Sequence, residues 1–559
     1  MMKPVFKTLT AAAVLAALQG CQQTPPEQTQ SNHTPVEIVG TTHPFAAESI
    51  YFVMTDRFVD GDPSNNYPNQ GGEHPTYQLP LNGPDGQMAY VGYMGGDFKG
   101  IANNADYIRD LGFTAVWLSP VVDNPDEAFA GGEPIEFAGA FKDGGKTGYH
   151  GYWASNFYKE DEHWVSADMD FKALDAALDA KGLKTVLDIV ANHGSPSFSM
   201  PVDQPKFGEI YDAEGKLVAD HQNLPPSQLD EANPLHQFFR HEPDILQLSN
   251  LDDRSPKVRD YLINSYLHWL AQGADAIRID TIKHVPHAFW KEMSDRVRAE
   301  YPNLFMFGES YDYKPEFIAQ HTLPENGAIS VLDFPGQKAI SEVFSQQDSD
   351  FARLQDYLFL SDAPYANVYE LTTFYDNHDM PRMNASDEGF IDAHNWLFTS
   401  RGIPVVYMGS EMGFMRGTAE HTGNRNYLGQ SGLAMARQSP IFEPLKRIAN
   451  VRKQVAALQR GVQVNLDFSG NTAAFYRVLQ YQGQHQIALV LLNKGDKAAE
   501  FTITDMLQPG VWTNQMTDKV QSVSRALTDT VPAHGVSVWV VNTPVTQPAL
   551  LQQIARQMQ

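Results

Sequence analysis

Charged and polar side chains follow several apolar segments of this sequence, where they could take part in chemistry. They are Asp188 with His193, Arg278 with Asp280, Glu309, and His378 with Asp379. Arg278 and Asp280 are two positions apart in an alternating segment, so both side chains point to one side of a strand. A buried arginine keeps such a carboxylate ionised, and an ionised carboxylate with apolar walls is a candidate nucleophile. A buried ion pair that only sets strand register fits this segment equally well.

The chemistry that suits such a set of acids is cleavage of a glycosidic bond. One carboxylate attacks the anomeric carbon, a second protonates the departing oxygen, and a third stabilises the positively charged transition state. Any one of these acids could be a solvated loop residue. A set that recurs on three strands beside His and Arg fits that alternative poorly, so the segments predict an active site if the fold brings them together.

The elements that must position these residues are eight apolar strands that alternate with helices. We expect the strands over 49–58, 114–120, 183–193, 276–280, 304–309, 329–334, 372–375 and 403–408. We expect helices over about 98–111, 168–180, 287–300 and 442–460. This alternation predicts an α/β fold, a closed (β/α)8 TIM barrel, with a doubly wound open sheet as the alternative. In a barrel, the carboxyl ends of all strands meet at one mouth.

The chain divides into several predicted parts. A Pro-rich stretch interrupts the barrel pattern after the third strand, and alternating strands without helices follow the last helix. The parts are a signal peptide 1–20, a flexible tether 21–46, the barrel 47–193 and 248–460, an inserted small domain 194–247, a C-terminal antiparallel β-sandwich 461–545 and a tail 546–559.

The first residues are typical of an export signal. Lys3 and Lys7 precede an apolar run, which ends in Leu18-Gln-Gly-Cys21. This order resembles the bacterial lipoprotein signal, in which Cys21 becomes lipidated; a plain secretory signal is the alternative. Cys21 is the only cysteine, so no intramolecular disulfide is possible. We expect an outer-membrane lipoprotein or a secreted protein that touches a membrane only through this anchor.

The charge of the chain excludes some partners. The net charge is −26, from 41 basic and 67 acidic residues, so nucleic acids and anionic membrane surfaces are poor partners. A neutral polar ligand such as a sugar is unaffected. The turn from Asp60 to Asn66 is dense in oxygen donors and suits calcium, although such turns occur more often without metal.

Six segments, taken in order, resemble the signature regions of the α-amylase superfamily of glycoside hydrolases (family 13), and the likeness extends over residues 47–545. The segments are 112–120, 188–193, 273–284, 307–309, 376–379 and 402–409. The resemblance implies a retaining mechanism. In it, Asp280 is the nucleophile, Glu309 is the general acid and base, and Asp379 is the transition-state stabiliser.

The same resemblance implies further site residues. Those expected to contact an α-glucan are His150, Tyr152, His193, Arg278, Lys283, His284, Tyr311 and His378. Two calcium sites are implied. The first would use Asp60, Asp62, Asn65, Asn66, Gly95 and Asp97, as in cyclodextrin glucanotransferases. The second would use Asn192, Asn250 and the carbonyl of His284, with Asn250 standing where family members that bind this ion usually have Asp.

The resemblance leaves three functions to compare. We expect a monomeric α-amylase-like endo-hydrolase of α-1,4-glucosidic bonds in starch, glycogen or maltooligosaccharides. The alternatives are a cyclodextrin or maltooligosaccharide hydrolase or a 4-α-glucanotransferase, and, more remotely, a non-catalytic glucan-binding lipoprotein. Two features favour hydrolysis: Leu246 replaces the aromatic residue around which those transferases wrap the glucan, and the chain ends soon after residue 545. The three intact carboxylates oppose a non-catalytic role.

Overall fold

The computed structural model describes residues 36–140 and 142–558. The predicted signal peptide, Cys21 and the first part of the predicted tether lie outside the described residues. Within the described ranges, no helix combines the length and the apolar character that crossing a bilayer requires.

Eight parallel strands form a closed barrel, as the sequence predicts. They are β1 (Ile50–Val53), β4 (Ala115–Leu118), β7 (Lys184–Ile189), β12 (Ala276–Ile279), β13 (Phe305–Gly308), β14 (Ser330–Val331), β15 (Thr372–Thr373) and β16 (Ile403–Tyr407). They lie in the order β14-β13-β12-β7-β4-β1-β16-β15, and a parallel bridge from Leu332 to Thr372 joins the two outer strands. The open doubly wound sheet is therefore wrong.

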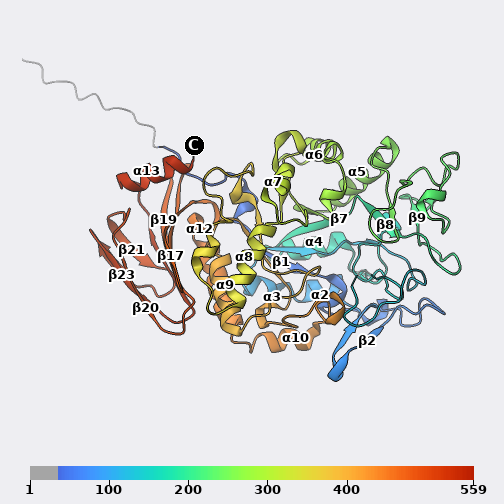
Figure 1. Cartoon of the computed structure of the whole chain (residues 1–559), viewed down its shortest axis with the longest axis horizontal. Helices are drawn as coiled ribbons and strands as arrows, with labels where there is room; N and C mark the ends of the chain where they lie inside the picture. The colour runs from blue at the N-terminus through green and yellow to red at the C-terminus, as the bar shows by residue number, and fades with distance from the viewer. Residues whose placement is uncertain (1–35, 141, 559) are drawn as a thin grey trace, which may run out of the picture. The chain divides into compact units, whose positions relative to one another are not determined.

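Most of the helices surround the barrel, whereas α13 lies beside the C-terminal strands, and all four expected ranges contain helix (Figure 1). They are α1 (Thr55–Phe58), α2 (Phe98–Asn103), α3 (Ala105–Asp110), α4 (Phe171–Asp179), α5 (Pro256–Leu270), α6 (His287–Glu300), α7 (Pro315–Ile318), α8 (Phe334–Ser345), α9 (Asp387–Leu397), α10 (Gly429–Ala436), α11 (Phe442–Gln454), α12 (Ala456–Arg460) and α13 (Pro548–Gln557). The expected helix 98–111 is broken at Asn104, whose side chain donates to the carbonyl of Gly100. The expected helix 442–460 is broken at Val455, which has extended backbone angles.

Helix α5 shows how the sequence positions the nucleophile strand. Val258, Leu262, Tyr266 and Trp269 form a buried stripe at helical spacing, as an amphipathic helix on a core requires. Gly273 then turns the chain with φ +137°, and a Cβ there would lie 1.8 Å from the Asp175 carboxylate. Only glycine fits this position, so the turn into β12 depends on it.

The segment between β7 and α5 is an insertion that shares its sheet with residues from before β7. Its strands are β8 (His193–Pro196), β9 (Glu209–Tyr211), β10 (Leu217–Asp220) and β11 (Leu248–Asn250). Strands β10 and β9 form one four-stranded sheet with β6 (Asn156–Glu160) and β5 (Val122–Asp123), in the order β10-β9-β6-β5, while β8 pairs with β11. A separate hairpin, β2 (Pro80–Asn82) and β3 (Met88–Tyr90), lies earlier in the chain. The segment between β4 and β7, which carries β5 and β6, thus completes the sheet of the insertion.

The C-terminal part is an antiparallel β domain. Its strands are β17 (Val462–Ser469), β18 (Thr472–Tyr481), β19 (Gln484–Asn493), β20 (Ala499–Ile503), β21 (Gly510–Asn514), β22 (Val520–Val523), β23 (Leu527–Val531) and β24 (Gly535–Val541). Six of them form the sheet β17-β18-β19-β24-β21-β22, and β20 pairs with β23. Figure 1 shows these strands on the side of the barrel opposite to β8 and β9. Helix α13 lies within the predicted tail and buries Leu550 and Ile554.

The expected flexible tether does not reach residue 46. Ile38 is 1% exposed and exchanges two backbone hydrogen bonds with Gln480 of β18, at 2.8 and 2.7 Å. This pairing forms beyond the end of β17, whose pairing with β18 stops at Val462 and Val478. A short 3-10 helix, Pro44–Ala47, follows. Ile38, an apolar β-branched residue, therefore anchors the chain within the range that was predicted to be a flexible tether.

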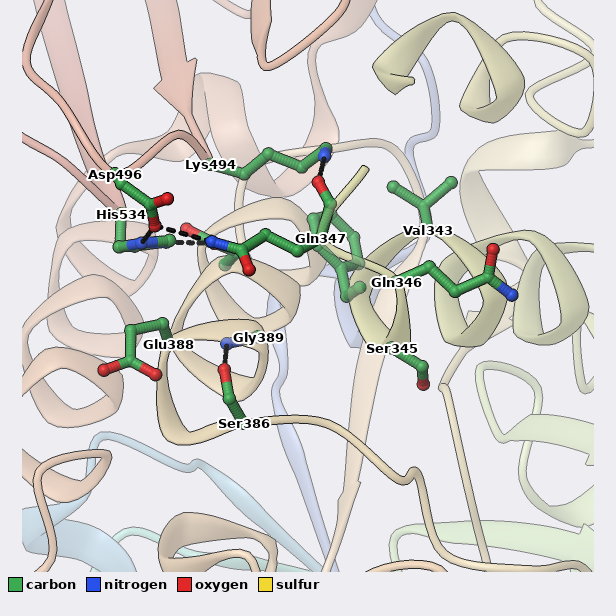
Figure 2. A pocket seen from close by; sticks show the side chains of 12 residues that line it. Val343, Ser345, Gln346, Gln347, Ser386, Glu388, Gly389, Lys494, Asp496 and His534 are labelled. Carbon is green, nitrogen blue, oxygen red and sulfur yellow. Dashed lines mark hydrogen bonds and ion pairs between the residues drawn. The ribbon is translucent and has the colours of Figure 1, made fainter. Parts of the chain in front are cut away.

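A charged junction joins the barrel helices to the β domain. His534 lies 2.8 Å from Asp392 of α9 and 3.1 Å from Asp496. Lys494 donates to the carbonyl of Gln347, and the side chain of Gln347 donates to Asp496 (Figure 2). These groups border a pocket of about 500 Å³.

Candidate active site

Arg278 links the carboxylates that the sequence places at separate strand ends. It is fully buried in β12, and its Nη1 donates to Asp280 at 2.9 Å while its Nη2 donates to Glu309 at 3.0 Å. Asp280 follows β12 and Glu309 follows the neighbouring β13. One guanidinium group therefore holds both carboxylates side by side at the carboxyl ends of adjacent strands.

Asp188 holds the guanidinium group of Arg278 by a hydrogen bond. Its carboxylate accepts from Arg278 Nη1 at 2.9 Å, from the indole of Trp117 at 2.9 Å and from the hydroxyl of Tyr152 at 2.8 Å. Burial raises the pKa of Asp188 to about 7, with Arg278 acting in the opposite direction. Asp188 lies at the end of β7, the strand before β12 in the barrel. It is thus a positioning residue, which holds the guanidinium group of Arg278 in place.

The residue after Asp280 has strained backbone geometry. Thr281 adopts the left-handed conformation with φ +46°, which is uncommon for a residue with a branched side chain. Its N–H donates to Glu309 at 3.3 Å. The sharp turn therefore ends β12 directly after Asp280 and directs a backbone donor toward the neighbouring carboxylate.

The electrostatics of the cluster favour a protonated Glu309. Glu309 is 5% exposed, and burial together with the negative charges of Asp280 and Asp379 raises its pKa well above the ordinary value. Arg278 opposes this shift, but the same guanidinium group also neutralises Asp188 and Asp280. One cation shared among several buried carboxylates leaves a proton on the least compensated acid. A carboxylic acid that stays protonated at neutral pH is suited to general acid catalysis.

Asp379 is held by residues that sequence reasoning missed. Arg425, in the loop after β16, donates to Asp379 at 2.7 Å and pairs with Glu420 at 2.6 Å. Lys146 donates to the same Glu420 oxygen at 2.8 Å. Although burial raises it, the pKa of Glu420 is held well below its ordinary value by Arg425 and Lys146. Residues this distant in the chain leave no spacing signal by which the sequence could have identified them.

The three carboxylates Asp280, Glu309 and Asp379 line one pocket of about 550 Å³. It also contains most of the residues expected to contact substrate, namely His150, Tyr152, His193, Lys283, His284, Tyr311 and His378. Arg278 is the exception, because it lies fully buried beneath the carboxylates rather than in the wall.

The imidazole groups of the pocket are suited to hydrogen bonding with neutral hydroxyls. Burial lowers the pKa of His150, His193 and His378, so all three rings are neutral at pH 7. Each has one buried ring nitrogen without a hydrogen-bond partner among the described residues. The ring of His378 stacks on Tyr152 at 5.4 Å, which gives the pocket an aromatic wall. Unpartnered buried polar atoms are costly unless a ligand satisfies them.

The loop after β1, which the sequence predicts to bind calcium, offers unsatisfied oxygens. Asp60 Oδ1, Asn65 Oδ1 and Asn66 Oδ1 are buried and have no hydrogen-bond partner within the described ranges. Asp62 and Asp97 are used locally instead: Asp62 caps a short 3-10 helix, and Asp97 caps α2 at 2.6 Å from the Gly100 N–H.

Gly95 lies against the same group of oxygens. It has φ +95°, and a Cβ there would lie 2.5 Å from Asn66 Oδ1. No cluster of three or more His, Cys, Asp or Glu side chains suited to a metal occurs in the described part of the chain. The three free oxygens nevertheless fit a hard cation such as calcium.

The second expected calcium set has a different arrangement. Asn192 donates to Asp244 at 2.8 Å, and the ring of His284 lies 3.0 Å from the same carboxylate. Asn250 keeps a buried oxygen with no partner in the described residues. Asp244, which lies in the insertion, therefore brings to this junction a negative charge that Asn250 lacks. Asp244 is not among the residues predicted from the sequence.

The closed barrel and the carboxylates at its mouth define an enzyme that acts on glycosidic bonds. The family model for the alpha-amylase catalytic domain matches residues 52–438. This match covers more than half of the chain, so the protein belongs to the α-amylase family.

Individual relatives include both transferases and hydrolases. A cyclomaltodextrin glucanotransferase from Bacillus sp. (strain 17-1) is 28% identical, over 98% of this chain and 74% of that protein. A solved structure described as the first cyclomaltodextrin glucanotransferase with a three-domain ABC distribution is 28% identical, with a TM-score of 0.70, over 89% of this chain and 99% of that one. The alpha-amylase from Geobacillus thermoleovorans, solved with acarbose, is 25% identical, with a TM-score of 0.66, over 89% and 99%.

Proposed function

We propose that the protein hydrolyses α-1,4-glucosidic bonds of starch, glycogen or maltooligosaccharides with retention of configuration. Asp280 attacks the anomeric carbon and forms a glycosyl-enzyme, while Glu309 gives its proton to the departing glycosidic oxygen. Glu309 then removes a proton from water, which attacks the anomeric carbon, displaces Asp280 and restores both acids. Asp379 binds hydroxyls of the sugar at the cleavage point and stabilises its positive charge.

One observation supports this proposal above all others, the shared hydrogen bonding of Asp280 and Glu309 to Arg278. Retaining glycosidases hold their two carboxyl groups close together, whereas inverting enzymes leave space for a water molecule between them. Two acids that contact the two terminal nitrogens of one guanidinium group match the close arrangement. The raised pKa of Glu309 supports its role as the acid.

The test is product analysis with maltoheptaose and soluble starch. Chromatography should show linear oligosaccharides, and NMR of the first products should show the α-anomer. An initial β-anomer would contradict retention. A preparation that cleaves neither substrate, but binds maltoheptaose, would favour the non-catalytic alternative.

Transfer to a sugar acceptor is the second candidate, favoured by the likeness to cyclomaltodextrin glucanotransferases. A three-domain organisation does not separate the candidates, because a solved transferase is described with that organisation. Leu246 favours hydrolysis: it borders the pocket, is 39% exposed and provides no aromatic ring. Leu246→Tyr should therefore raise the share of cyclic products. Cyclic products from the unchanged protein would favour transferase activity instead.

We propose calcium at the loop formed by Asp60, Asn65 and Asn66, with Gly95 at close approach. When bound, the ion would tie this loop together and contribute stability. Chelation should lower the melting temperature of the unchanged protein, and Asp60→Asn should remove most of that difference. Equal melting of the unchanged protein with and without chelator would contradict a structural ion.

We also propose that Cys21 is lipidated and that the protein is an outer-membrane lipoprotein, as the N-terminal signal suggests. Metabolic labelling with a radioactive fatty acid should mark the unchanged protein and not Cys21→Ser. Equal labelling of both proteins, or none, would contradict the anchor.

A further inference from the structure

A group of exposed aromatic side chains follows the predicted general acid. Tyr311, Tyr313 and Phe317 are 37%, 42% and 46% exposed. Among the described residues, the other large aromatic exposed to this degree is Tyr67. Tyr311 and Tyr313 lie against each other, and Phe317 follows them four residues later in the chain. Exposed apolar side chains that gather in this way mark binding surfaces more often than scattered ones do. We call the three residues the aromatic strip.

The strip begins inside the active-site pocket and continues out of it. Tyr311 lines the pocket, and its ring centroid lies 6.1 Å from that of Tyr313, at an interplanar angle of 85°. Both rings contact Phe334, at 4.8 and 5.9 Å, and Phe334 is fully buried at the start of α8. Tyr311 and Tyr313 therefore rest on the rigid core rather than on a free loop.

The backbone of the strip is also held in place. Lys283 Nζ, from the loop after β12, donates to the carbonyl of Tyr311 at 2.5 Å. In the short helix α7, Ile318 is buried while its neighbour Phe317 points outward. The ammonium group of Lys338 lies 5.9 Å above the ring of Tyr313. Such preorganised rings lose little conformational entropy when a ligand binds.

The position of the strip indicates which part of a substrate would reach it. Glu309 is two residues before Tyr311, and the proposed mechanism has Glu309 protonate the departing oxygen. The departing portion of a glucan therefore leaves the pocket on the side of Tyr311. A pyranose ring has an apolar face of C–H groups together with polar hydroxyls, which matches the amphipathic character of tyrosine.

We propose that Tyr313 and Phe317 bind the reducing-end portion of a long α-glucan outside the pocket. This inference rests on the proposed function and goes further by assigning a binding surface for long chains. Continuity with the pocket through Tyr311 favours a glucan over a protein partner as the occupant.

The test compares long and short substrates. Tyr313→Ser and Phe317→Ser should each lower kcat/KM for maltoheptaose or amylose by about two- to tenfold, through KM. The value for an aryl maltoside, too short to reach beyond the pocket, should not change. Tyr481→Ser, which removes a half-buried tyrosine at the end of β18, is the matched control and should alter neither value.

Several results would overturn the inference. An equal loss for long and short substrates would show that the rings only support the pocket, and unchanged values for both would show that they bind nothing. If sedimentation showed a dimer of the unchanged protein and a monomer of Tyr313→Ser, the strip would be a contact between copies. By contrast, failure of the unchanged protein to cleave any of these substrates would contradict the proposed function itself.

Discussion

The mouth of the barrel and the junction with the β domain are built from the same kinds of charged residue, yet they differ in whether their buried polar atoms have partners. At the mouth, the single guanidinium group of Arg278 contacts Asp188, Asp280 and Glu309. At the junction, His534 contacts both Asp392 and Asp496, and Figure 2 shows the contact with Asp496. Asp392 raises the pKa of His534 to about 9, so the ring is a cation at neutral pH.

The difference teaches that cavity size does not identify the chemical site. The two pockets have about 550 and 500 Å³. At the junction, Lys494 is a second cation beside the pocket carboxylates Glu388, Asp392 and Asp496, and it hydrogen-bonds to Gln347 and Asn471. At the mouth, His150, His193 and His378 each keep a buried ring nitrogen without a partner in the described part of the chain, whereas both ring nitrogens of His534 contact a carboxylate. Buried polar atoms that have no partner within the protein are the ones available to bind a substrate.

Exchanging one carboxylate for an amide in each region should separate the two roles most strongly. Asp280→Asn should lower kcat by about 10⁴-fold or more, because the amide is not a nucleophile, with a change of less than about 1 kcal/mol in the free energy of unfolding. Asp392→Asn should leave kcat unchanged and lower stability by about 1 kcal/mol. Kinetics with maltoheptaose and urea unfolding measure both, and retained activity in Asp280→Asn would refute the nucleophile assignment.

The pH profile should sharpen the comparison. Activity is expected to fall as pH rises through the pKa of Glu309, because the general acid then loses its proton. Since the charge of Asp379 raises that pKa, Asp379→Asn should move the alkaline limb of kcat/KM to lower pH by on the order of one unit. The limb should stay in place in Asp392→Asn. A limb that moves equally in both variants would assign it to global stability instead.

The junction should show the smallest effect, with its own pH dependence. The pKa of His534 is raised above its unfolded value of about 6.5, so its stabilisation is complete below that pH and is lost as pH rises through about 9. Because the ring is partly exposed to water, we expect His534→Gln to cost about 1 kcal/mol at pH 7 and almost nothing at pH 10. Urea unfolding at both pH values measures this, and a constant difference would contradict the ion pairs.

Burial of Asp392 acts in the opposite direction within the same pair. It raises the pKa of that carboxyl group to about 6, so acid below this value begins to remove the charge that His534 contacts. The comparison between pH 7 and pH 10 avoids this range, because Asp392 stays ionised throughout it. Activity of His534→Gln on maltoheptaose should equal that of the unchanged protein at pH 7.

Local patterns were sufficient to predict the strands and the acids at their ends. Ala276–Ile279 alternates Arg278 with apolar side chains, and this pattern predicts a buried strand followed by Asp280. The same reasoning failed for residues 38–46, because a Gln- and Thr-rich composition does not reveal that Ile38 pairs with Gln480, more than 400 residues later. It also could not show that β5 and β6 complete the sheet of the insertion, since that pairing depends on where the barrel ends place the two segments.

By itself, the sequence determined the eight strands and the acids that follow them, because hydrophobic periodicity is a local property of the chain. The tertiary structure decided between a closed barrel and an open sheet, through the bridge from Leu332 to Thr372. Only the tertiary structure decided the electrostatic state of those acids. Contacts between distant segments decide that Glu309 shares Arg278 with Asp280 and that Arg425 pairs with Asp379. They also decide that Asp244 lies beside His284. Burial and charge act through space, so the raised pKa that suits Glu309 to acid catalysis follows from the fold rather than from spacing along the chain.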